Sequence, residues 1–153
     1  MAIDLKRRGF AQQVLGVEAE PVNASAALGI GLADQVVGLH ECVSCSDIIV
    51  LAVPVGAARR LLLEILDMIP EGSDKVVIDV CSTKDHLVHS VKDHPARRHY
   101  VATHPMAGTE YSGPWAAMSG MFDGHACIIC DSEDSCPEAV TKVEALYDTL
   151  NMR

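Results

Sequence analysis

The amino-acid sequence predicts an α/β fold, in which helices cover both faces of a mainly parallel sheet. Short runs rich in Val and Ile alternate along the chain with longer patterns of helical periodicity. The turns between these runs are short, which favours strands joined through helices. The chain is 49% hydrophobic but only 4% aromatic, so Ala, Val, Leu and Ile must supply most of the core. This composition is typical of parallel strands that are buried on both faces.

The first quarter of the chain predicts two short helix–strand cycles. Apolar Ile3, Leu5 and Phe10 lie among polar residues, which indicates a helix, and Gly9 is expected to end it. The other elements expected here are a strand at 13–17, an Ala-rich helix at 21–28 and a minor strand at 34–37.

The remaining sequence continues the alternation. Pro54 is expected to end a fully buried strand, and Ser82 or Thr83 is expected to cap a helix that runs to about residue 91. A strand at 99–102 should stop before Pro105, which cannot donate to a ladder. The expected strands are 47–53, 75–80, 99–102 and 126–130, and the expected helices are 41–45, 55–69, 82–91 and 137–150.

Net charge and hydropathy exclude several classes of partner. The formal charge is −9, which argues against nucleic acid or an anionic membrane surface. No apolar run reaches the roughly 20 residues that a bilayer span needs. The first residues lack the apolar core of a secretory signal, so we expect a cytoplasmic protein.

Two C-x-x-C pairs raise the alternative of a zinc site. Cys127 and Cys130 lie in a β-branched run, and residues three apart on a strand point to opposite faces. Cys42 and Cys45 lie about 80 residues earlier, far beyond zinc-ribbon spacing. We therefore expect no metal, and free thiols that are mostly buried. A helical His86–His89 pair is interpreted as surface residues.

Candidate site residues follow the predicted strands. Five residues lie at or just after the carboxyl end of a predicted strand: Glu18, Val53, Pro54, Ser82 and His104. Ligands of open α/β sheets gather at this edge. The sequence therefore predicts a ligand site there.

The stretch from His104 to Gly113 combines a titratable imidazole with a polar loop. Glu110 contributes a carboxylate, and Thr109 is among the neighbouring hydroxyl residues. An imidazole on a strand end that faces such a loop suits general acid–base chemistry. The alternative is that His104 only caps the strand.

These residues carry a family resemblance. The run from His104 to Glu110, His-Pro-Met-Ala-Gly-Thr-Glu, is followed by Ser112-Gly113 and resembles the signature of prephenate and arogenate dehydrogenases. The run Asp-Val-Cys-Ser-Thr-Lys, residues 79–84, resembles that family's second motif at the expected distance. The resemblance covers nearly the whole chain.

The resemblance implies NAD-dependent oxidative decarboxylation of a ring substrate in tyrosine biosynthesis. His104 would accept the proton of the ring hydroxyl, and Ser82 would orient that oxygen and contact the nicotinamide. Glu110 and Thr109 would position the substrate or gate the pocket, and the alternative is that Glu110 is a plain surface residue. Apart from the resemblance, Lys84 is expected to brace the loop electrostatically, and Trp115, in a Gly-Pro-Trp context, is expected to pack in a lid rather than to contact a ligand.

Glu18 predicts the cofactor. A carboxylate after the second strand of a dinucleotide fold binds the ribose hydroxyls and repels a 2′-phosphate, and no Arg follows closely. NAD is therefore expected rather than NADP, with Val53, Pro54 and Ser82 as further cofactor contacts. The alternative is that Glu18 is a solvated surface residue.

A dinucleotide fold normally opens with a strand and a Gly-x-Gly-x-x-Gly turn. Gly29 and Gly31 are no substitute, because they follow a helix and precede a strand. Residues 1–153 are thus expected to form a partial Rossmann-like, NAD-binding domain without the usual first strand and turn. The resemblance places a helical dimerisation domain, with the arginine that binds the substrate carboxylate, outside this chain. The full-length protein would be a homodimer, and the chain alone would be inactive.

The sequence alone does not distinguish between several functions. Prephenate and arogenate cannot be distinguished, because the side-chain contacts are expected elsewhere. A β-hydroxyacid dehydrogenase is a second enzyme class, although its usual lysine on a later helix has no place here. A degenerate nucleotide-fold protein that binds without catalysis is the non-enzyme alternative.

Overall fold

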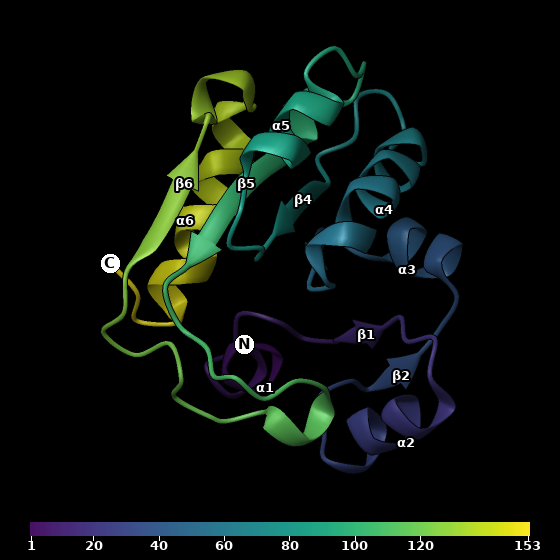
Figure 1. The fold of residues 1–153 in the computed structure, drawn as a ribbon, viewed down its shortest axis with the longest axis vertical. Helices are drawn as coiled ribbons and strands as arrows, with labels where there is room; N and C mark the ends of the chain where they lie inside the picture. Colours follow the sequence, from purple (N-terminus) through teal and green to yellow (C-terminus); the bar gives the residue numbers. More distant parts are fainter.

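A four-stranded sheet organises the larger part of the molecule (Figure 1). The structure is a computed structural model that describes residues 1–153. The sheet order is β3-β4-β5-β6, and the strands are β3 (Ile48–Leu51), β4 (Val76–Asp79), β5 (Tyr100–Pro105) and β6 (Cys127–Cys130). Strands β3, β4 and β5 are parallel, and β6 runs antiparallel to β5. All four residues of β4 are buried, as its run of branched apolar side chains predicts.

Helices cover both faces of this sheet. Alternate strand residues point to opposite faces, so Val77 and Tyr100 pack with α4 (Val55–Asp67) and α5 (Asp85–Val91). Val76 and Val101 pack instead with α6 (Pro137–Thr149) and with Leu5 of α1 (Ala2–Arg7). The predicted α/β fold with a mainly parallel sheet is therefore confirmed, and its topology is Rossmann-like.

A second, two-stranded sheet lies apart from the first. Strands β1 (Leu15–Gly16) and β2 (Gln35–Val36) are parallel and are joined through α2 (Pro21–Gly29). Helix α3 (Leu39–Cys45) then leads into β3. Figure 1 shows this pair beside α2, across from the ends of the larger sheet. No residue between 12 and 38 belongs to either of the two large core clusters.

The boundaries of several elements differ from the predictions. Strands β1 and β2 are shorter than expected, since each pairs only with the other, and α3 begins at Leu39 rather than residue 41. Gly9 ends the first helical segment as predicted, with the left-handed φ of +77° that favours glycine.

The prediction that Pro105 stops its strand is wrong. Pro105 pairs with Cys127 of β6, and the next amide, of Met106, donates to the carbonyl of Ala126 at 2.8 Å. Antiparallel pairs alternate between hydrogen-bonded and non-bonded positions, so Pro105 occupies a non-bonded one. Strand β4 has already ended at Asp79 on the other side of β5. The missing amide hydrogen therefore costs no ladder bond.

The cysteines are free, as expected, but most of them are not buried. Only Cys42 and Cys81 are buried, and Cys45 is exposed. Cys127 packs on the α6 side of the sheet and Cys130 on the α4–α5 side, so they face opposite ways as predicted. The structure brings together no group of three His, Cys, Asp or Glu residues that could hold a metal ion. No helix has the length and apolar character of a membrane span.

Candidate active site

The predicted site residues lie at the carboxyl ends of the parallel strands. Val53 and Pro54 come just after β3, and Ser82 lies three residues after β4. His104 lies in β5, beyond the last residue of that strand that pairs with β4. Because β3, β4 and β5 are parallel, these positions share one edge of the larger sheet. Glu18 stands two residues after β1, at the corresponding end of the smaller sheet.

Ser82 is exposed on a loop that closes on Asp79. The amide of Cys81 donates to Asp79 Oδ1 at 2.9 Å, and Lys84 Nζ forms an ion pair with the same oxygen. The amide of Val80 also donates to the carbonyl of Leu51, at 3.3 Å. The bonds to Asp79 and Leu51 thus hold residues 80–84 in place, and Ser82 is exposed to solvent. The predicted bracing role of Lys84 agrees with this ion pair.

The prediction that Ser82 or Thr83 caps the following helix is wrong. Helix α5 begins at Asp85, with Lys84 at the cap position, and no side chain caps it. The bonds of Cys81 and Lys84 to Asp79 hold the intervening residues in a loop, so they do not form a first helical turn. The Ser82 hydroxyl therefore has no capping role in this structure.

His104 presents a half-buried imidazole at the strand end. The preceding Thr103 is buried and bonds toward α6, so His104 lies on the opposite face of β5. The histidine hydrogen bonds within the protein belong to His89, His94 and His99. Both ring nitrogens of His104 are therefore free to contact a ligand.

The loop after β5 holds Thr109 and Glu110. Both side chains are exposed and line a shallow pocket of about 480 Å³ together with Tyr111, Ser112 and Trp115. Thr109 Oγ1 accepts a hydrogen bond from the Tyr111 amide at 3.3 Å, which orders the turn. The structure brings Thr109 and Glu110 together, but this pocket does not include His104 or Ser82.

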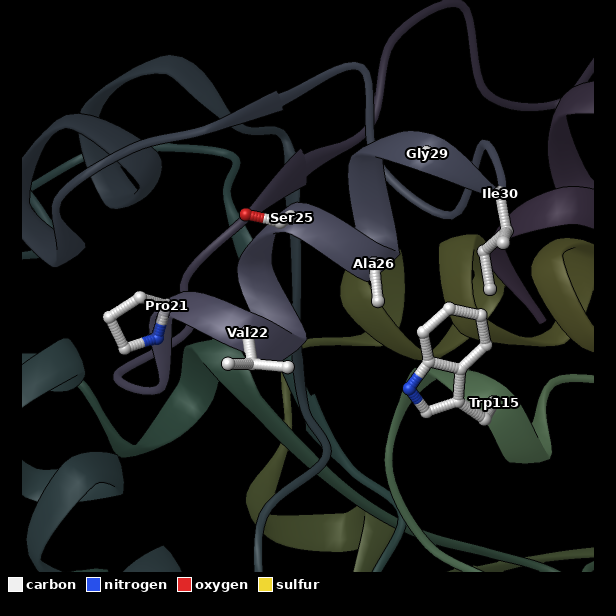
Figure 2. Close-up of a pocket in the computed structure, with 7 residues that line it drawn as sticks. All are labelled: Pro21, Val22, Ser25, Ala26, Gly29, Ile30 and Trp115. Carbon is white, nitrogen blue, oxygen red and sulfur yellow. The ribbon is translucent and has the colours of Figure 1, made fainter.

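A larger, mostly apolar hollow lies between α2 and the same loop. Figure 2 shows the Trp115 ring beside Ile30, with Ala26 and Val22 along the facing side of α2. The cavity measures about 670 Å³. Trp115 lies in the short helix η2 (Pro114–Ala116) that contacts α2, and the residue is 72% exposed. The indole therefore packs at the margin of the loop rather than within a core.

Glu18 and Pro54 have surroundings that suit a nucleotide. Glu18 is exposed, and its Oε1 accepts a hydrogen bond from the Glu20 amide at 2.9 Å. The other carboxylate oxygen stays available to hydroxyl donors. Pro54 precedes the 13-residue helix α4, whose first amides have no side-chain cap.

A network of buried polar groups, which the sequence pattern did not predict, lies beneath these residues. Tyr100 donates its hydroxyl to Asp79 Oδ2 at 2.6 Å, and Thr103 donates Oγ1 to the Asp79 carbonyl at 2.5 Å. Tyr147 of α6 lies 2.6 Å from the same Thr103 oxygen. Burial, and then the charge of Asp79, raises the pKa of the Tyr100 hydroxyl, so it remains a donor. The only sequence cue was an aspartate that ends an apolar strand five residues before a lysine.

Comparison with known proteins identifies the family. The family model for the nucleotide-binding domain of prephenate dehydrogenase matches residues 1–153. The chain belongs to this family. Prephenate dehydrogenase of Bacillus subtilis is 26% identical over 157 residues, which cover 99% of this chain and 41% of that protein.

Solved structures share the fold of this chain. The Aquifex aeolicus prephenate dehydrogenase superposes with a TM-score of 0.89 at 23% identity, covering 99% of this chain and 54% of that one. The same enzyme in complex with hydroxyphenyl propionate and NAD⁺ gives 0.83 at 24% identity, with 99% and 53% covered. Synechocystis arogenate dehydrogenase gives 0.86 at 22% identity, with 99% and 52% covered. The chain thus spans between about two fifths and just over half the length of these relatives.

Proposed function

We propose that this chain is the nucleotide-binding part of an NAD-dependent prephenate dehydrogenase. Such an enzyme would convert prephenate to 4-hydroxyphenylpyruvate by oxidative decarboxylation. The observation that carries the proposal is the position of His104, at the carboxyl edge of the sheet with both ring nitrogens free, next to the strand whose loop presents Ser82. Family membership supports the proposal.

His104 and Ser82 have different roles at the substrate hydroxyl. A neutral imidazole nitrogen of His104 accepts the hydroxyl proton as hydride leaves the same carbon, because imidazole is a competent base near neutral pH. The Ser82 hydroxyl hydrogen-bonds the ring oxygen and holds it toward His104. Bound NAD supplies the acceptor for the hydride. Loss of carbon dioxide then makes the ring aromatic.

The residues after β1 and β3 fit NAD. A free carboxylate oxygen of Glu18 can accept hydrogen bonds from both ribose hydroxyls, whereas it would repel a 2′-phosphate. The next residues, Ala19 and Glu20, add no positive charge. Val53, Pro54 and Ser82 are the further proposed cofactor contacts. The complex of the Aquifex enzyme with NAD⁺ supports this choice.

Thr109 and Glu110 are proposed to position the substrate or gate its entry. Their exposed loop follows His104 directly, so a movement of that loop would change access to the imidazole. Arogenate is the second candidate substrate, because the Synechocystis arogenate dehydrogenase shares this fold with a TM-score of 0.86. A homodimer and a cytoplasmic location remain predictions for the full-length protein.

Spectrophotometric assay of NADH formation tests the function. The purified full-length protein would be given prephenate or arogenate, each with NAD or NADP, beside a His104→Asn control that reveals contaminating dehydrogenases. We expect turnover with prephenate and NAD that the control lacks. Turnover with arogenate alone would select the second substrate. NAD binding by calorimetry without turnover of either substrate would favour a protein that only binds nucleotide.

A further inference from the structure

Asp79 links the two elements that carry Ser82 and His104. Its side chain is fully buried at the end of β4, directly beneath the carboxyl edge of the sheet. The carboxylate bonds to the loop that follows β4, and the backbone carbonyl of the same residue bonds to β5. No other residue of the chain makes side-chain hydrogen-bond contacts with both segments.

The carboxylate side fixes the Ser82 loop. Asp79 Oδ1 accepts hydrogen bonds from the Cys81 amide and from the Lys84 ammonium. Cys81 directly precedes Ser82, and Lys84 follows it by two residues. Lys84 Nζ lies in a side chain that is only 12% exposed, so the ion pair is largely shielded from water. Oδ2 accepts the Tyr100 hydroxyl at 2.6 Å. A charged carboxylate can accept all these bonds at once, whereas an amide cannot.

The carbonyl side fixes the strand of His104. The ladder between β4 and β5 ends at the pair Asp79–Ala102, directly before Thr103. At this end of the ladder the Thr103 hydroxyl donates a side-chain hydrogen bond to the Asp79 carbonyl at 2.5 Å. The Thr103 hydroxyl has only one proton, which it donates to Asp79. In the 2.6 Å hydrogen bond between Thr103 and Tyr147, the tyrosine hydroxyl must therefore be the donor. The bond from Thr103 extends the strand contact to the residue that immediately precedes His104.

We propose that Asp79 is a positioning residue, which fixes the separation and orientation of the Ser82 hydroxyl and the His104 imidazole. The role depends on the function proposed above, because it is exerted through those two residues. Misplacement of reacting groups by about 1 Å can cost on the order of 10²-fold in rate. A buried ion pair that served stability alone would have no such effect on rate.

Substitutions in the full-length protein separate positioning from stability. Asp79→Asn keeps the shape but leaves one oxygen to accept the Cys81 amide, Lys84 and Tyr100. Lys84→Met removes the ammonium, and Thr103→Val removes the hydroxyl to β5 while keeping the branched shape. We expect kcat to fall by about 10²-fold for Asp79→Asn, with a smaller change in the KM for NAD. Lys84→Met and Thr103→Val should each lower kcat by a smaller factor.

A double-mutant cycle with a matched control sharpens the test. If Asp79 and Lys84 act as a unit, the double variant should be no slower than the slower single variant. The control is the exposed pair Lys142–Asp74, at 2.8 Å and remote from the strand ends, and Asp74→Asn with Lys142→Met should leave kcat unchanged. Variants that lower the unfolding temperature but keep kcat within twofold would overturn the proposal. Multiplicative effects of Asp79→Asn and Lys84→Met would overturn the claim that the pair acts as a unit.

Hydrogen exchange gives a readout that does not need activity. In Asp79→Asn, the Cys81 amide should exchange faster than in the wild type, whereas Asp74→Asn should leave it unchanged. This comparison remains decisive if the wild type proves inactive with both substrates, which would contradict the proposed function alone. An unchanged Cys81 exchange rate in Asp79→Asn would contradict the link itself.

Discussion

Ser119 donates a hydrogen bond from its Oγ to Asp4 Oδ1 at 2.7 Å, and so joins the first helix to the segment after η2. The amide of Gly120 donates to the other carboxylate oxygen at 3.1 Å, and Arg7 reaches Oδ1 at 3.0 Å. Asp4 is 1% exposed. Through its buried carboxylate, Asp4 therefore holds α1 against the segment that contains Ser119 and Gly120.

Replacing Asp4 with Asn should destabilise the fold. Burial opposes the charged form, but the bonds from Ser119 and Gly120 and the charge of Arg7 outweigh it, so the pKa of Asp4 lies below its ordinary 3.8. We expect a loss of about 1–3 kcal/mol in the free energy of unfolding at neutral pH, as is usual for hydrogen bonds to a buried charged group. Urea denaturation would measure it, with the exposed Asp148→Asn as a control near zero.

The effect of Asp4 should depend on pH. Because the folded pKa is depressed, the stabilisation is fully present above the ordinary pKa and is lost as the pH falls through the folded value. The difference in unfolding free energy between wild type and Asp4→Asn should therefore shrink toward acid. A difference that stays constant from about pH 7 down to about pH 3 would contradict this account.

Replacing His104 should act on the chemical step. We expect His104→Asn to lower kcat by about 10²–10⁴-fold, the usual size of a general-base contribution. NAD affinity should barely change, because the imidazole acts on the substrate. The matched control is His86→Asn on the exposed surface of α5, which should keep wild-type kinetics. Equal kcat values for the two variants would refute the assignment of His104.

Replacing Glu18 should change cofactor preference. The full-length protein should prefer NAD, and Glu18→Gln should narrow the preference by removing the charge that repels a 2′-phosphate. The ratio of kcat/KM for NAD and NADP measures the effect. Glu20→Gln removes a neighbouring exposed charge and is the control. A wild-type enzyme that used both cofactors equally well would make Glu18 an ordinary surface residue.

The thiols of Cys81 and Cys45 should differ in reactivity. Burial, with the charge of Asp79, raises the pKa of Cys81 from 9.0 to about 11. Its thiolate fraction near neutral pH is thus about 10²-fold lower than that of an ordinary thiol. Iodoacetamide should therefore modify exposed Cys45 well before Cys81, as followed by mass spectrometry of the native protein. Comparable rates in the native state would contradict the buried placement, and equal rates are expected only after denaturation.

Local pattern was sufficient to predict the central strands and the long helices. The runs at Ile48–Leu51 and Val76–Asp79 are short, branched and apolar, which predicts strands. Of these two, only β4 is buried on both faces; the prediction that the strand before Pro54 is fully buried is wrong, because β3 lies at the edge of the sheet and its Val50 is exposed. The helix at Pro137–Thr149 was within one residue of the prediction, since its proline and its apolar spacing mark its start and its buried face.

Tertiary contacts decided the features that the sequence could not reveal. The strand continues through Pro105 because β6 pairs there, on a side that needs no amide hydrogen. Ser82 stands in a loop because a buried carboxylate attracts Lys84, a contact made across several residues. The bond from Thr103 to Asp79 joins residues 24 positions apart. Each of these depends on which groups meet in space, and residue patterns report only the local spacing.

The small β1–β2 sheet can unfold separately from the larger sheet and its helices. Residues 12–38 contribute nothing to the two main core clusters, and an isolated two-stranded sheet is only marginally stable. Local opening of this unit should therefore need less free energy than global unfolding, and its amides should exchange first. A dinucleotide that touched Glu18 on one unit and Val53 on the other would oppose that opening. Cofactor binding would then bring the two units into a single transition, because a ligand stabilises only the states that can hold it.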